Sequence, residues 1–242
     1  MFTKQEFHLM KELTLSDFKL KYKNSSLGFF WSLLKPLAML MTLYIVFKLF
    51  IKIESENYIL FLLLGIILWN FFSESTVFGL NSVVSKSNIV KKINFKYEIL
   101  IISACLVSFL SFILNFMVFL GFLLLIKGLP PISGFYIIIP ILEMFFLSLG
   151  LSLILSLLFI RYRDIGYLWD IFLQIGFWIS PVAYPLEIVP AKFLGFYMLN
   201  PVAMMITVSR EVILYDKLPD TAMLIMSFLF TITILTFGYT LY

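Results

Sequence analysis

The sequence predicts an all-α integral membrane protein that crosses a bilayer about six times. Hydrophobic residues make up 62% of the 242 residues and charged residues only 13%, whereas soluble domains are about half apolar and a quarter charged. The mean hydropathy is +1.03. The apolar runs are also longer than a buried strand or a core helix requires, which indicates that lipid surrounds much of the chain.

Six apolar stretches approach the roughly 20 residues that a helix needs to cross a hydrocarbon core about 30 Å thick. They are residues 36–53, 58–80, 99–126, 135–160, 167–185 and 221–242. A seventh stretch, residues 193–208, is short and is interrupted by Gly195, Asn200 and Pro201. We expect it to enter the membrane and return on the same side.

The lysines and arginines between these stretches predict the orientation, because cationic connections stay in the cytoplasm. Six crossings place both termini on one side, and twelve of the eighteen basic residues fall on that side. We therefore expect cytoplasmic termini. The other six are assigned to the outer side: Lys48, Lys52, Lys127, Lys192, Arg210 and Lys217.

The N-terminal residues 4–23 have the pattern of a helix lying along the cytoplasmic membrane surface. Leu9, Leu13 and Leu20 fall near one side of such a helix, and His8 near the other. No linker separates a soluble domain. Residues 1–242 are therefore predicted to form one transmembrane domain, in which residues 1–35 are the cytoplasmic interface helix and its lead-in.

The residues that catalysis or nucleotide binding would need are missing from the sequence. It has no Gly-rich phosphate loop, so energy for active transport would have to come from another protein. The single histidine, His8, and the single cysteine, Cys105, predict neither a metal site nor an enzyme. The net charge of +4 reflects basic connections that set membrane orientation, and we expect no nucleic acid partner.

Three carboxylates fall within or beside the predicted spans. Glu143 is the deepest, Glu74 lies in the second span, and Asp170 lies near the start of the fifth. A proton-driven pump would carry a denser set with basic partners at matching depth. The simplest interpretation is that these carboxylates face the bundle interior or a watery cavity.

Aromatic residues gather in the fifth predicted span. Their flat faces suit the apolar faces of sugar rings and would let a polymer slide past without tight binding. The residues predicted to line such a channel are Trp169, Phe172, Phe177, Trp178 and Tyr184.

The prolines at 181 and 185 are predicted to stop this fifth helix and to break the chain that follows, because proline lacks the amide donor that a helix needs. Residues 181–208 are a candidate outer gate, with 186–210 as its re-entrant part, since broken backbone at membrane depth must line a cavity or be buried in protein. Its predicted members are Pro181, Pro185, Asn200 and Pro201. An ordinary extracytoplasmic loop remains the alternative.

Several motifs resemble those of the type-2 ABC exporter permeases that export polysaccharides, including O-antigen and teichoic acid. They occur in that family's order over most of the chain. The matching residues are Asp17, Lys21-Tyr22-Lys23, Ser25, Leu27-Gly28, Trp31, Pro36, Arg161-Tyr162-Arg163-Asp164-Ile165, Ser180 to Pro185, and Leu199-Asn200-Pro201. Two features depart from the family's pattern. Ser16 stands where members usually have Arg before the Asp. Members also usually continue beyond the sixth span with a short basic tail.

The resemblance implies six transmembrane helices, an amphipathic interface helix, and re-entrant helices between the fifth-span helix and the sixth. It implies a homodimer in the bacterial plasma membrane that moves lipid-linked glycan with two copies of a cytoplasmic ATPase subunit, which would bind the ATP and Mg²⁺. Residues 89–92 would form a coupling helix. The residues implied to contact the ATPase are Lys19, Tyr22, Lys23, Ile89, Lys91, Lys92, Arg161, Arg163 and Asp164.

Other functions are less compatible with these residues. The nearest alternative is an ABC permease for small hydrophobic drugs or lipids. A membrane-embedded glycolipid enzyme would require clustered acidic or histidine residues near one interface. An ion channel would require rings of polar residues along a span, and a secondary transporter more intramembrane charges.

Overall fold

The computed structural model describes residues 3–23, 28, 30–52, 57–87, 96–197 and 199–242, and it forms no strand within them. This confirms the all-α class. The bundle helices are α2 (Phe30–Tyr44), α3 (Tyr58–Ser85), α5 (Glu98–Ile126), α6 (Ile138–Arg161), α7 (Ile165–Ile179) and α10 (Thr221–Thr240). The others are α1 (Lys4–Tyr22), α8 (Ala191–Tyr197), α9 (Pro201–Leu214), the π-helix η1 (Ile45–Phe50) and the 3₁₀ helices η2 (Ile132–Ile137) and η3 (Leu186–Ile188).

Five helical segments of the described chain are long and apolar enough to cross a membrane. They are Phe30–Lys48, Tyr58–Ser85, Glu98–Ile126, Ile132–Arg161 and Thr221–Thr240, and each overlaps one of the predicted stretches. The first begins six residues before its predicted start, because Pro36 lies inside α2 and does not begin it.

Helix α7 covers only part of the predicted fifth span. It has 15 residues, or roughly 22 Å at 1.5 Å per residue. The apolar stretch runs on to residue 185, but the helix itself stops at Ile179, and Ser180 is extended with φ −79° and ψ 145°. The cause is Pro181, whose ring disfavours helical backbone at the residue before it.

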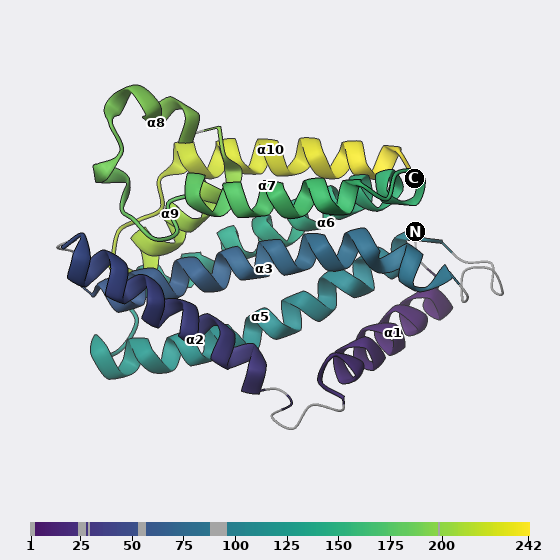
Figure 1. The fold of residues 1–242 in the computed structure, drawn as a ribbon, viewed down its shortest axis with the longest axis horizontal. Helices are drawn as coiled ribbons and strands as arrows, with labels where there is room; N and C mark the ends of the chain where they lie inside the picture. The colour runs from purple at the N-terminus through teal and green to yellow at the C-terminus, as the bar shows by residue number, and fades with distance from the viewer. Residues whose placement is uncertain (1–2, 24–27, 29, 53–56, 88–95, 198) are drawn as a thin grey trace.

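Helix α3 is the centre of the bundle (Figure 1). Nineteen of its 28 residues are buried, and it packs most extensively on α5 and α6 and also touches α2, α7 and α9. It contributes more side chains to the main hydrophobic core than any other helix does. The remaining bundle helices therefore expose one side outward.

Small residues let neighbouring helices approach closely. A Cβ on Gly79 of α3 would lie 2.2 Å from Oγ of Ser152 on α6, and a Cβ on Gly238 of α10 would lie 2.6 Å from the Gly150 carbonyl oxygen of α6. Apolar side chains gain little by leaving lipid for one another, so close packing of this kind holds membrane helices together.

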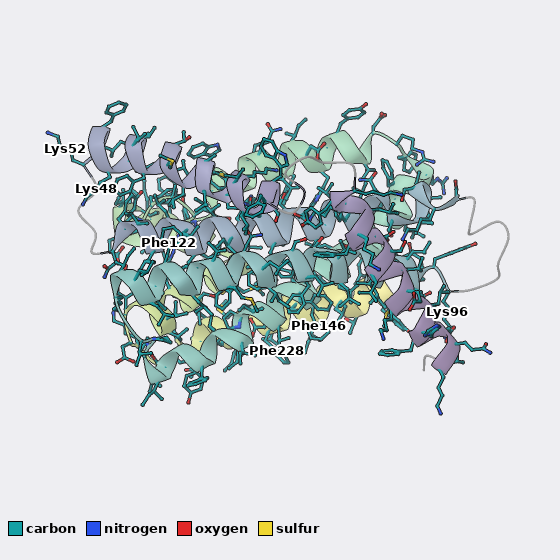
Figure 2. All side chains as sticks on the ribbon, turned by 90° about the horizontal axis from the view of Figure 1, so that it is seen from below. Lys48, Lys52, Lys96, Phe122, Phe146 and Phe228 are labelled. Atoms are coloured by element: carbon teal, nitrogen blue, oxygen red, sulfur yellow. The ribbon has the colours of Figure 1, made fainter. Side chains whose placement is uncertain are left out.

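The outer surface of the bundle is apolar along its length and charged at its ends. Figure 2 shows Lys48 and Lys52 at one end and Lys96 at the other, with Phe146 and Phe228 on the flank between them. Phe146 is 42% exposed and Phe228 51%. The two chain termini lie at the same end of the molecule (Figure 1).

Helix α1 begins with a capping box: the Thr3 hydroxyl accepts from the Glu6 amide, and the Thr3 amide donates to Glu6 Oε2 at 2.7 Å. This backbone hydrogen bond, more than any other contact, lowers the pKa of Glu6. The helix packs on α5 through a side that includes Thr14, which is buried. Leu9 and Leu13 are half-buried as the predicted pattern expects, but Leu20 is exposed.

Candidate functional site

The segment from Ser180 to Pro185, directly after α7, is the best-anchored irregular stretch of the described chain. Ser180, Pro181, Val182 and Ala183 are all buried. Because this backbone lies outside any helix, its carbonyl groups need partners from elsewhere in the protein. Helices α9 and α3 supply partners for the carbonyl groups of residues 181–183, and α8 contacts the segment through a side chain.

Helix α9 supplies two of these contacts. Asn200 caps α9 with its side-chain oxygen, which accepts from the amides of Val202 at 3.0 Å and Ala203 at 3.3 Å. Its Nδ2 donates to Ser180 Oγ at 2.9 Å, while Arg210 donates to the carbonyl oxygens of Pro181 and Val182. The predicted gate residues Pro181, Asn200 and Pro201 therefore lie close together, with Pro201 in the first turn of α9.

Helices α3 and α8 supply the rest. The Tyr58 hydroxyl of α3 donates to the Ala183 carbonyl oxygen at 2.5 Å. The Tyr184 hydroxyl donates to the Trp178 carbonyl oxygen at 2.7 Å and shares a hydrogen bond of 2.5 Å with the Tyr197 hydroxyl of α8. Tyr184 thus connects the end of α7 with α8.

The five aromatic residues predicted to line a channel fall into three groups around α7. Phe177 and Trp178 line a cavity of about 600 Å³ between α2, α3 and α7. Trp169 and Phe172 stack at 4.9 Å between ring centroids and line a second cavity, of about 420 Å³, on α3, α6, α7, α9 and α10. Tyr184 borders a third, of about 660 Å³, beside Phe47 and Pro190.

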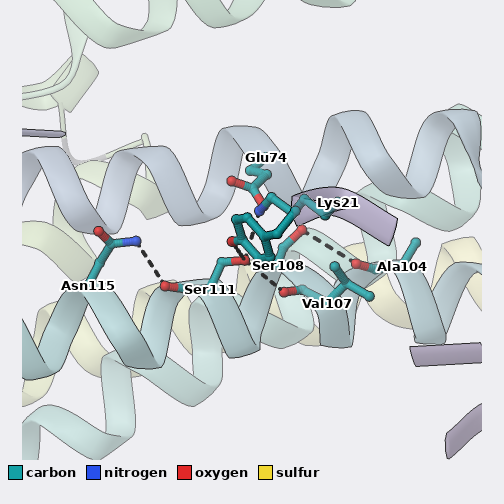
Figure 3. Close-up of polar contacts among 8 residues, drawn as sticks. Lys21, Glu74, Ala104, Val107, Ser108, Ser111 and Asn115 are labelled. Carbon is teal, nitrogen blue, oxygen red and sulfur yellow. Dashed lines mark hydrogen bonds and ion pairs between the residues drawn. The ribbon is translucent and has the colours of Figure 1, made fainter. Parts of the chain in front are cut away.

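At the other end of the bundle, α1 is tied to the spans by charged groups. Lys21 pairs with Glu74 of α3 and donates to Ser111 Oγ of α5 at 2.7 Å. Figure 3 shows Lys21 reaching between these two helices. Lys86 pairs with Asp17, the acidic residue that follows Ser16.

The residues predicted to contact an ATPase differ in exposure where the structure describes them. Lys19, Lys23, Arg161, Arg163 and Asp164 are exposed. Tyr22 is half-buried, with its hydroxyl 3.2 Å from Ser111 Oγ. Residues 89, 91 and 92, predicted for the coupling helix, lie outside the described residues.

The three carboxylates noted in the spans have different surroundings. Glu74 is paired with Lys21. Glu143 is buried and accepts from Ser227 Oγ of α10 at 2.5 Å. Asp170 is exposed and borders a small cavity with Arg163. Within the described ranges, no three His, Cys, Asp or Glu residues are grouped as a metal site would require.

The sequence interpretation missed two of the residues that hold this site. Arg210 was assigned to an outer connection, but it is 4% exposed within α9. Its place inside the apolar run 201–214 is the signal that could have identified it. Tyr58 was taken as the start of a span, and nothing in the sequence shows that its hydroxyl reaches residue 183.

Comparisons with known proteins identify the family. The family model for ABC-2 type transporters matches residues 8–214. Two O-antigen export system permease proteins RfbA from Klebsiella pneumoniae are 31% and 30% identical, over 85% and 88% of this chain and 80% and 82% of theirs. A third, from Myxococcus xanthus, is 25% identical over 88% of this chain and 82% of its own. With its apolar bundle and a family match that covers most of its length, the chain is an integral membrane permease that belongs to the ABC-2 type transporter family.

Proposed function

We propose that this protein is the membrane subunit of an ATP-driven exporter that moves lipid-linked polysaccharide out of the cytoplasm. The observation that carries the proposal is its 31% identity, over 85% of the chain, to a protein named as an O-antigen export permease. The protein supplies the path, and a separate cytoplasmic ATPase subunit binds ATP and Mg²⁺ and supplies the energy. It is not itself an enzyme.

In this proposal the chain crosses the membrane six times, with α7 as the fifth crossing and α8 and α9 as re-entrant helices. The segment after α7 supports this interpretation, because residues 180–183 continue the chain beyond the helix and are buried. An even number of crossings agrees with termini at one end of the molecule (Figure 1). That end faces the cytoplasm, and residues 181–208 form the outer gate.

The proposed assembly contains two copies of this chain and two ATPase subunits. The exposure of α7 supports a second copy: only Leu173 and Phe177 of its 15 residues are buried. The ATPase docks where Lys19, Lys23, Arg161, Arg163 and Asp164 are exposed. Substrate passes along α7, whose aromatic side chains contact the sugar rings, and then through the outer gate.

The test is export by reconstituted protein. Inverted vesicles holding the permease and its ATPase are given ATP and a radiolabelled lipid-linked glycan, and we expect the glycan to become protected inside the vesicles. An ATPase variant that binds but cannot hydrolyse ATP is the control. ATP-dependent movement of a hydrophobic dye without movement of glycan would replace the proposal with the drug or lipid exporter, and movement of neither would refute both.

A further inference from the structure

Arg210 is a buried cation held by main-chain oxygen atoms. It is 4% exposed. Its Nε and Nη2 donate to the Phe61 carbonyl oxygen at 3.3 and 3.0 Å, its Nη2 also donates to the Val182 carbonyl oxygen at 2.7 Å, and its Nη1 donates to that of Pro181. The guanidinium lies 3.4 Å from the centroid of the Phe61 ring.

No carboxylate in the described part of the chain forms an ion pair with Arg210; the ion pairs there join Lys21 to Glu74, Lys86 to Asp17 and Lys96 to Glu6. Burying a cation is unfavourable unless oxygen atoms replace its water. Here three carbonyl groups from two other elements do so. The contact set therefore persists only while α3, α9 and residues 181–182 stay together.

Gly65 of α3 makes room for this contact. A Cβ at this position would lie 2.3 Å from Arg210 Nη2 and 2.9 Å from the Val182 carbonyl oxygen. Even the smallest side chain would therefore push the guanidinium away from Phe61 and Val182. Gly65 and Arg210 are 145 positions apart in sequence, yet each fits only with the other.

Arg210 also borders an open cavity that offers other acceptors. This cavity of about 540 Å³ is lined by Phe61, Glu187, Arg210 and Glu211, among others. If residues 181–182 moved away, the guanidinium would lose two of its three carbonyl acceptors, and the carboxylates of Glu187 and Glu211 would be the nearest negative charges in the cavity. A movement of residues 181–182 would therefore require Arg210 to exchange their carbonyl groups for other acceptors.

We propose that Arg210 is a positioning residue that holds the outer gate closed. It binds residues 181–182, which follow α7, to α3 and α9 until substrate passes. The inference rests on the proposed function for the identity of the gate. Beyond the proposed function, the inference assigns two roles: Arg210 holds the gate in its closed position, and Gly65 leaves the space that the guanidinium of Arg210 occupies. Opening then consists of releasing the Pro181 and Val182 carbonyl groups from the guanidinium.

The test measures passive leak in the absence of ATP. Proteoliposomes containing the permease with its ATPase are loaded with radiolabelled glucose, and its efflux is followed. We expect Arg210→Met and Gly65→Ala each to raise the efflux at least about tenfold, and Arg210→Lys to raise it less, because lysine keeps the charge but not the planar donor geometry. Gly121→Ala is the matched control, since a Cβ there meets nothing within 4 Å.

Each variant is first checked for a single oligomeric peak and for its melting temperature in detergent. If Arg210→Met does not fold, Gly65→Ala and Arg210→Lys still decide the matter. Wild-type efflux from folded Gly65→Ala and Arg210→Lys would overturn the proposal. Increased leak without any glycan export would retain the latch and reject the substrate, whereas glycan export with no change in leak would reject the latch alone.

Discussion

Most hydroxyl groups in the spans donate to a carbonyl oxygen of their own helix, as Ser108 does to Ala104 and Ser209 to Met205. Such bonds satisfy the hydroxyl without joining two helices. The Ser227 hydroxyl differs, because it also donates to a side chain on another helix, that of Glu143. The pair lies between α6 and α10 and satisfies a carboxyl group that is 6% exposed.

We expect Glu143→Gln to leave export unchanged, because an amide oxygen can accept the same hydrogen bond from Ser227. Ser227→Ala should lower the free energy of unfolding by about 1–3 kcal/mol, since the carboxyl group loses its partner. Thr233→Ala is the control, because this exposed hydroxyl on α10 bonds only to Leu229 of its own helix. Loss of export in a stable Glu143→Gln protein would show that the carboxylate itself takes part in transport.

At the scale of helices, the sequence predicts which residues form each membrane helix better than it predicts which helices contact one another. The length of an apolar run determines where a helix crosses, so five of the six predicted stretches overlap full-length helices. The end of α7 depends on Pro181, which the sequence contains and which was predicted to stop this helix. The contact between Gly65 and Arg210 depends on how α3, α9 and residues 181–182 pack together, which no single run of residues reveals.

The close contact between α6 and α10 gives a prediction for these helices. Gly238→Val should separate them, because its Cβ would lie 2.6 Å from the Gly150 carbonyl oxygen and 3.2 Å from Leu153 Cβ. We expect the free energy of unfolding to fall by about 1–3 kcal/mol, as is typical of an overpacked contact. The measurement is a lower melting temperature in detergent. Gly121→Val should change it little; equal losses in both variants would mean that valine disturbs any span and that the contact is unimportant.

Helix α1 should loosen when its ion pair with Glu74 of α3 is removed. The side chains of Lys21 and Glu74 are 20% and 33% exposed. We therefore expect the pair to stabilise the docking of α1 by about 1–2 kcal/mol, which is more than a surface ion pair and less than a buried one. In Lys21→Met, backbone amides of α1 should exchange hydrogen roughly 5- to 30-fold faster, as measured by mass spectrometry.

Lys19→Met is the matched control for this helix, because Lys19 is exposed and lies two residues away. Exchanging the two charges, with Lys21→Glu and Glu74→Lys together, should restore part of the protection. Equal exchange rates in Lys21→Met and Lys19→Met would show that the Lys21–Glu74 pair does not hold α1 in place.

Over the whole molecule, the apolar flank and charged ends follow from composition, whereas the grouping of site residues does not. Residues 169–178 lie on one helix, and the sequence treats their aromatic side chains as a single lining. A helix turns about 100° per residue, so Trp169 and Phe172 reach one cavity while Phe177 and Trp178 reach another. Which cavity faces a second copy of the chain depends on the assembly, a level that the sequence of one chain does not describe.

The orientation of the whole molecule yields the last prediction. If both termini are cytoplasmic, a cysteine in place of Lys192 on α8 should react with a membrane-impermeant maleimide in intact cells. A cysteine in place of Tyr97, at the start of α5, should react only after permeabilisation. Both positions are exposed, and the native Cys105 is 0% exposed, so it should remain unlabelled and the wild-type protein serves as the control. The reverse labelling pattern would invert the molecule in the membrane. Labelling of both cysteines in intact cells would put α8 and the start of α5 on the same face, which six crossings with re-entrant α8 and α9 do not allow.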